Sequence, residues 1–188
     1  MKYNPLIHHR RSIRLKDYDY SNAGAYFITI CCEDRIHRFG KVSDNKMILN
    51  ESGTIAYNEW INLSVRFSNF ELDVFQIMPN HMHGIIVLSD ISSFSTAVGA
   101  TLVVAQEEDE LNRVTARVAP TISDIVGAYK SIVSNACLQL FKSHDKTMGK
   151  LWQRNYYEHI IRDERAYNNI SNYIIDNPSK WDEDKFHL

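Results

Sequence analysis

Two histidines, His81 and His83, stand one residue apart at the start of an apolar run that continues through residues 85–88. In an extended strand successive side chains alternate between faces, so both imidazoles point the same way. Two neutral imidazoles can bind one divalent metal ion, each through one ring nitrogen while a neighbour orients the other nitrogen. The spacing alone also leaves open a pair of half-buried histidines that bind nothing.

A second pair lies near the C-terminus, where residues 163–177 have the apolar spacing of a helix. Tyr167, Ile170 and Ile174 form the stripe expected to dock on a sheet. Tyr173 and Asn177 are four residues apart, one helical turn, at the edge of that stripe. A phenol there can face a neighbouring cleft, and the alternative is a core tyrosine whose hydroxyl reaches water.

The elements that must position these residues follow from hydrophobic periodicity and turn signals. Alternating and β-branched runs predict strands, and the 3.6-residue period predicts helices. Pro79 and Asn80 predict a two-residue hairpin turn, Thr121 or Ser123 caps a helix, and Pro178 ends the last one. We expect strands at 26–32, 46–49, 70–78, 81–88 and 151–162, and helices at 51–66, 121–141 and 163–177.

The order of the main elements is β-α-β-β-α-β-α, which is the split β-α-β, ferredoxin-like arrangement. The expected fold class is α+β, with an antiparallel four-stranded sheet and an added C-terminal helix. A chain of 188 residues fits one domain spanning 1–188. Three cysteines without C-x-x-C spacing favour a reducing cytoplasm, and no stretch has the length and hydropathy of a membrane span.

Two segments stand apart from this pattern. Residues 1–24 are expected to be a basic arm, with five basic and two acidic side chains within residues 1–20 giving a local charge of +3. Residues 89–119 are expected to be a flexible insertion, since no period persists there. The overall net charge of −2 neither demands nor excludes a nucleic-acid partner. The arm is a candidate for DNA contact through Arg10, Arg11, Arg14 and Lys16, and a solvated tail is the alternative.

Three separated stretches together resemble one known family. They are Pro79-Asn80-His81-Met82-His83, residues 151–164 beginning Leu151-Trp152-Gln153-Arg154-Asn155-Tyr156-Tyr157, and Asn172-Tyr173-Ile174-Ile175-Asp176-Asn177-Pro178. In this order and spacing they resemble the REP-associated tyrosine transposases, which belong to the HUH single-tyrosine transposases of insertion sequences. The resemblance runs from about Arg10 to Lys180 and excludes most of residues 89–119.

The resemblance implies a site and a reaction. His81 and His83 match the metal-binding histidines of the HUH motif, Tyr173 matches the nucleophile, and Asn177 matches the amide that completes the metal site. It implies cleavage and rejoining of DNA, hence transposition and recombination, through a phosphotyrosine intermediate with a 3′-hydroxyl leaving group. Mg²⁺ or Mn²⁺ is the expected cofactor, and two imidazoles keep zinc open as an inhibitory occupant.

The implied partner is single-stranded DNA folded into an imperfect hairpin. The residues expected to contact it, besides the arm, are Lys130, Trp152, Gln153 and Arg154. A monomer acting in cis is favoured, and a homodimer with a shared site stays open.

Rival interpretations concern both the nucleophile and the function. Tyr156, Tyr157 and Tyr167 are assigned to packing or to base stacking, because only Tyr173 has an amide one turn further on. One alternative function is a domesticated regulator that binds hairpin DNA with little cleavage. Another is a nucleotide hydrolase of the His-x-His-x-His kind. It ranks last because this chain has Ile85 where that motif requires its third histidine.

Overall fold

A computed structural model describes residues 23–89 and 120–187, and its main feature is a four-stranded antiparallel sheet in the order β4-β5-β1-β6. The strands are β1 (Gly24–Cys31), β4 (Phe70–Ile77), β5 (His81–Leu88) and β6 (Tyr157–Ile161). The expected α+β, ferredoxin-like arrangement is therefore confirmed. A separate hairpin joins β2 (Gly40–Ser43) to β3 (Lys46–Leu49).

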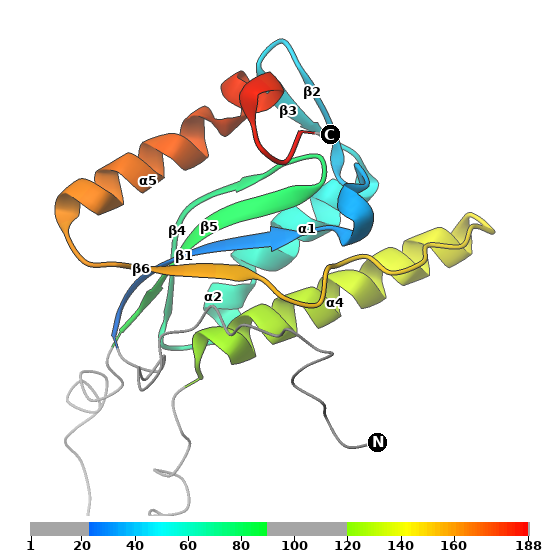
Figure 1. The fold of residues 1–188 in the computed structure, drawn as a ribbon. Helices are drawn as coiled ribbons and strands as arrows, with labels where there is room; N and C mark the ends of the chain where they lie inside the picture. Colours follow the sequence, from blue (N-terminus) through cyan, green and yellow to red (C-terminus); the bar gives the residue numbers. More distant parts are fainter. Residues whose placement is uncertain (1–22, 90–119, 188) are drawn as a thin grey trace, which may run out of the picture.

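Helices cover both faces of the sheet (Figure 1). One face packs on α1 (Glu51–Ile61), the short α2 (Leu63–Arg66) and α4 (Ile122–Ser143). The opposite face carries α5 (Glu164–Asp176), which continues into the 3₁₀ helix η3 (Asn177–Glu183). A short 3₁₀ turn, η1 (Glu33–Arg35), follows β1.

Side chains of successive residues in the two central strands, β1 and β5, point to opposite faces of the sheet, so each strand contributes to both faces. Tyr26, Ile28 and Ile30 of β1 are fully buried against the α1 and α4 side, together with Met82 and Ile86 of β5. Their neighbours Thr29 and His83 are cross-strand partners on the other face, under α5. A single strand therefore contributes to the core with one set of residues and to a site with the other.

The helices begin where capping chemistry allows. Thr121 caps α4 through a capping box with Asp124, in which each side chain satisfies a backbone N–H of the other residue. Asp163 caps α5 by accepting a hydrogen bond from the Ala166 N–H at 2.7 Å. The choice left open between Thr121 and Ser123 is thus decided for Thr121.

Several expected boundaries are wrong. The helix expected at 51–66 is interrupted at Asn62, and three residues, Met78 to Asn80, separate β4 from β5 instead of two. The strand expected at 151–162 is ordered as β6 only from Tyr157, because Trp152 turns into the core and forms an isolated bridge with Cys32. Pro178 ends the α-helix but not the helical path, since proline fits the first turn of η3.

The basic arm and the insertion, residues 1–24 and 89–119, lie almost wholly outside the described residues. Among the residues that are described, no helix combines the length and the hydropathy needed to cross a membrane.

Candidate active site

The two histidines of β5 converge beneath α5. His81 and His83 are 0% and 1% exposed, and their Nε2 atoms are 3.1 Å apart. Strand alternation brings the rings to one face, as the sequence predicts. The outer nitrogens are held as well: His81 Nδ1 lies 2.8 Å from Asn80 Oδ1, and His83 Nδ1 lies 2.8 Å from Thr29 Oγ1.

Tyr173 reaches this pair from α5. Its hydroxyl oxygen is 3.2 Å from His83 Nε2, and its ring contacts those of His83 and Phe27 at centroid distances of 5.2 and 6.3 Å. The side chain is 39% exposed, so one side of the phenol faces solvent. The helix holds this position because Ile174 is fully buried and the Tyr167 hydroxyl donates to both carboxylate oxygens of Asp73, at 3.0 and 2.9 Å.

Asn177 follows one turn later, where α5 ends, and is 2% exposed. Its Nδ2 donates to Asp184 Oδ2 at 2.6 Å. Its Oδ1 is buried and has no hydrogen-bond partner. A buried amide oxygen without a donor is costly unless something else satisfies it, and a cation beside the two imidazoles would do so.

Asp184 is a site residue that the sequence analysis missed. Among residues 23–89 and 120–187, His81, His83 and Asp184 are the group of metal-ligating side chains whose ligand atoms lie within 4.8 Å of one another. Asp184 follows η3, and its second oxygen accepts the Phe186 N–H at 2.7 Å. No period or motif marks this aspartate, because it lies in a short polar stretch where Asp182 and Glu183 are equally acidic.

Burial sets the protonation states of the site. It lowers the pKa of His81 to about 4 and that of His83 well below its usual value, so both imidazoles are neutral at pH 7. Burial, followed by the negative charge of Asp184, raises the pKa of Tyr173 to about 12. Without a bound metal ion, the phenol of Tyr173 therefore keeps its proton at neutral pH.

These donors fit a divalent cation. Two neutral imidazole nitrogens, an unpartnered amide oxygen and a carboxylate form a mixed nitrogen and oxygen set, which suits Mn²⁺ or Mg²⁺ and is also compatible with zinc. The residues that would hold the ion are His81, His83 and Asn177, with Asp184 adjacent.

A cavity of about 360 Å³ opens beside this cluster. It is lined by Tyr173 and Asn177 from α5 and by residues of the following turn and tail, namely Lys180, Glu183, Asp184 and Lys185. Its two ammonium groups are balanced by the two carboxylates, and Lys180 also pairs with Asp176 at 3.2 Å.

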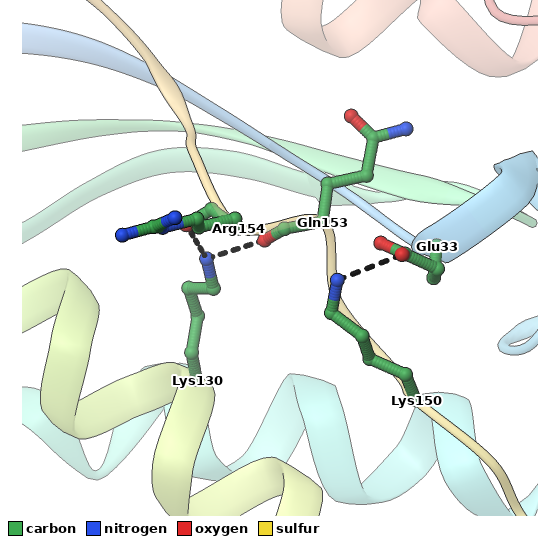
Figure 2. A network of polar contacts seen from close by, with 5 residues as sticks. All are labelled: Glu33, Lys130, Lys150, Gln153 and Arg154. Carbon is green, nitrogen blue, oxygen red and sulfur yellow. Dashed lines mark hydrogen bonds and ion pairs between the residues drawn. The ribbon is translucent and has the colours of Figure 1, made fainter. Parts of the chain in front are cut away.

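Two of the residues expected to contact DNA, Trp152 and Lys130, have side chains that make contacts within the protein. Trp152 is 4% exposed and packs against Phe39 and Tyr129, so it is a core residue. Figure 2 shows Lys130 donating to the carbonyl oxygens of Gln153 and Arg154, at 2.7 and 3.0 Å. Beside it, Lys150 pairs with Glu33 at 2.7 Å.

Lys130 therefore fixes the path of this segment, and burial lowers its pKa. Arg154 is exposed and Gln153 is half-buried. Arg10, Arg11, Arg14 and Lys16 lie outside the described residues.

The rival tyrosines lie elsewhere. The Tyr156 hydroxyl is 3.0 Å from Ser123 Oγ, on the α4 side of the sheet. Tyr167 is bound to Asp73, and Tyr157 is half exposed on β6, where its ring contacts Phe27. Elsewhere on β6, Glu158 is the cross-strand neighbour of Ile28 on the core face, and His159 is exposed. Among the tyrosines that the structure describes, Tyr173 is the one whose hydroxyl lies within hydrogen-bonding distance of the histidine pair.

Comparisons with known proteins agree with the resemblance. No protein-family model matches the chain. A protein of Haemophilus influenzae named only "Uncharacterized protein" is 39% identical over 187 residues, covering 100% of this chain and 98% of that protein. This chain belongs to the same family as that protein. A second Haemophilus influenzae protein, named "Putative REP-associated tyrosine transposase", is 26% identical over 163 residues, covering 86% of this chain and 74% of that protein.

A solved structure of a REP-associated tyrosine transposase bound to a REP hairpin matches with a TM-score of 0.56 and 20% identity, over 90% of this chain and 74% of that chain. At this identity the match establishes the fold. The resemblance inferred from the three motifs is confirmed by the shared fold together with the sequence relative.

Proposed function

Because this chain is related in fold and sequence to the REP-associated tyrosine transposases, we propose that it is a metal-dependent transposase acting on single-stranded hairpin DNA. It cleaves and rejoins the strand through a phosphotyrosine at Tyr173, as a monomer in the cytoplasm. The observation that carries the proposal is the position of the Tyr173 hydroxyl, 3.2 Å from His83 Nε2 and beside a buried unpartnered amide oxygen.

In the proposed reaction, the Tyr173 oxygen attacks phosphorus, a tyrosine–phosphorus bond forms, and the bond to the 3′-oxygen breaks. The phenol gives up its proton and the 3′-oxygen gains one on leaving as a hydroxyl. Asp184 is the carboxylate whose negative charge helps to raise the pKa of Tyr173, and we propose it as the acceptor of the phenolic proton. When bound at His81, His83 and Asn177, Mg²⁺ or Mn²⁺ would polarise the phosphate and offset its developing negative charge.

The covalent link conserves the energy of the phosphodiester, so rejoining by a 3′-hydroxyl needs no nucleotide cofactor. We expect Lys180 and Lys185, which line the adjoining cavity together with Glu183 and Asp184, to contact the phosphate of the strand.

One observation favours the alternative function, a regulator that binds hairpin DNA with little cleavage. The ring of Phe186 lies against both imidazoles, with centroid distances of 4.6 Å to His81 and 5.8 Å to His83. The C-terminal segment therefore covers one side of the histidine pair.

The test uses 5′- and 3′-labelled hairpin DNA from the flanks of the protein's own gene, with Mn²⁺ or Mg²⁺. We expect a covalent protein–DNA adduct that requires metal and is lost in Tyr173→Phe. Tyr157→Phe is the matched control, since it removes a hydroxyl from a half-exposed tyrosine on the strand next to β1 and should retain the adduct. Tight hairpin binding without any adduct would instead support the regulator, and an adduct that survives in Tyr173→Phe would contradict the assigned nucleophile.

A further inference from the structure

Asn80 sits next to the histidine pair and is 1% exposed. Its side chain makes three contacts. Nδ2 lies 3.1 Å from the carbonyl oxygen of Arg35 and 2.8 Å from that of Phe186, and Oδ1 lies 2.8 Å from His81 Nδ1. Every polar atom of this buried amide therefore has a partner.

These contacts fix which way the amide faces. A carbonyl oxygen only accepts hydrogen bonds, so the atom that faces Arg35 and Phe186 is the donating NH₂ group. The amide oxygen is then the atom that faces His81, and it too only accepts. The proton in that contact belongs to His81, which donates from Nδ1. In a neutral imidazole this leaves Nε2 with a lone pair.

The other histidine has a different kind of partner. His83 Nδ1 meets the hydroxyl of Thr29, which either donates or accepts. The Nε2 atoms of the two rings are 3.1 Å apart, and two lone pairs at that distance repel. Since His81 Nε2 has no proton, a hydrogen bond between the rings requires the proton on His83 Nε2. The Tyr173 hydroxyl, 3.2 Å from that nitrogen, then accepts from the same N–H, and the Thr29 hydroxyl donates to His83 Nδ1.

We propose that Asn80 is a positioning residue that holds His81 in its Nδ1–H tautomer, so that the Nε2 lone pair is ready for a metal ion. Thr29, in contrast, has a hydroxyl that can donate or accept, so it is compatible with either tautomer of His83. A metal ion held at His83 Nε2 would require the proton of that ring on Nδ1, where the Thr29 hydroxyl would accept it. This inference rests on the proposed function for the metal, but the tautomer of His81 without metal follows from its contact with Asn80 alone.

Nitrogen-15 NMR of histidine-labelled, metal-free protein at pH 8 tests the first part, because protonated and unprotonated ring nitrogens differ widely in chemical shift. We expect His81 to carry its proton on Nδ1 and His83 on Nε2, with signals assigned from single histidine variants. A proton on Nε2 of His81 in the wild-type protein would overturn the proposal without any variant of Asn80.

Two substitutions separate the acceptor from the other contacts of the amide. Asn80→Asp keeps an oxygen toward His81 and loses the NH₂ donor, whereas Asn80→Ala loses both. We expect the Nδ1–H tautomer of His81 to persist in Asn80→Asp and to become mixed in Asn80→Ala. Loss of the tautomer in both variants would mean that the donor contacts to Arg35 and Phe186, and not the acceptor, hold the ring.

Calorimetric titration with Mn²⁺ measures the consequence. Replacing a residue that orients a metal-binding histidine costs about 10- to 100-fold in metal affinity, so we expect that loss in Asn80→Ala and a smaller one in Asn80→Asp. Affinity within twofold of wild type in a folded Asn80→Ala, with an unchanged tautomer, overturns the proposal. If the wild-type protein binds no metal, the proposed function fails. The NMR measurement of the His81 tautomer in the wild type and the Asn80 variants would still test the role of Asn80.

Discussion

At the scale of single residues, the site depends on two imidazoles that are buried while neutral. Their outer nitrogens have partners in Asn80 and Thr29, and their inner nitrogens face each other and Tyr173. Protonating either ring would place a charge in a buried position beside another histidine. The same burial that prepares the pair for a cation therefore makes it sensitive to acid.

This sensitivity predicts how stability depends on pH. The pKa of His81 is lowered to about 4 in the folded protein. Between pH 6.5 and 4, His81 is therefore protonated in the unfolded chain but remains neutral in the folded chain. The stabilisation is complete above pH 6.5 and is lost as the pH falls toward 4. The pKa of His83 is also lowered in the folded protein, so this residue too makes the protein less stable as the pH falls. Urea unfolding with a chelator present should show the free energy of unfolding falling by about 1.4 kcal/mol per pH unit for each histidine below pH 6.5.

The matched control is a variant with glutamine at both positions, His81→Gln with His83→Gln. It should lose less stability between pH 6.5 and 5 than the wild-type protein. Parallel curves for the two proteins would show that other groups cause the acid sensitivity.

At the scale of elements, β5 has to lie close to α1 on one face while it presents the histidines on the other. Gly84 allows this approach. A Cβ atom at Gly84 would lie 2.7 Å from Cζ2 of Trp60, and the Trp60 ring is fully buried. Since Gly84 follows His83 directly, the packing of the core and the position of the ligand are coupled through one strand.

We expect Gly84→Ala to destabilise the protein by about 1–3 kcal/mol, because a methyl group overpacks the contact between β5 and α1. It should also weaken Mn²⁺ binding by moving His83. Gly127→Ala is the control: Gly127 is exposed within α4, and its added Cβ meets nothing within 4 Å, so helix propensity should stabilise that variant by up to about 1 kcal/mol. Equal effects of the two substitutions would contradict the packing argument. Thermal unfolding and calorimetry measure both.

At the scale of the whole molecule, one chain supplies every component of the candidate site. β5 brings the histidines, α5 brings Tyr173, and the segment after η3 folds back to bring Asp184 (Figure 1). The 3.2 Å contact between Tyr173 and His83 lies within the same chain. A partner subunit is not needed to complete this arrangement.

This arrangement predicts that inactive variants do not complement each other. Tyr173→Phe lacks the nucleophile and His83→Ala lacks a ligand, and a mixture of the two should form no covalent DNA adduct. A shared site between subunits would restore activity, because one intact tyrosine and one intact histidine pair could meet. Tags of different size on the two variants identify which chain carries any adduct.

The sequence by itself determined the features that depend on local spacing. Period-two alternation put His81 and His83 on one face, and a separation of one helical turn put Tyr173 beside Asn177. The order of strands and helices also gave the confirmed fold class, because those elements are recognised within windows of a few residues.

The tertiary structure decided the contacts between distant segments. Thr29 lies 54 residues from His83, and Asp184 reaches the histidines from the far end of the described chain. The core position of Trp152 and the short extent of β6 likewise depend on Phe39, Tyr129 and Cys32, which lie elsewhere in the chain. Such contacts leave no local period, because the two sides of each contact are brought together only when the whole chain buries its core.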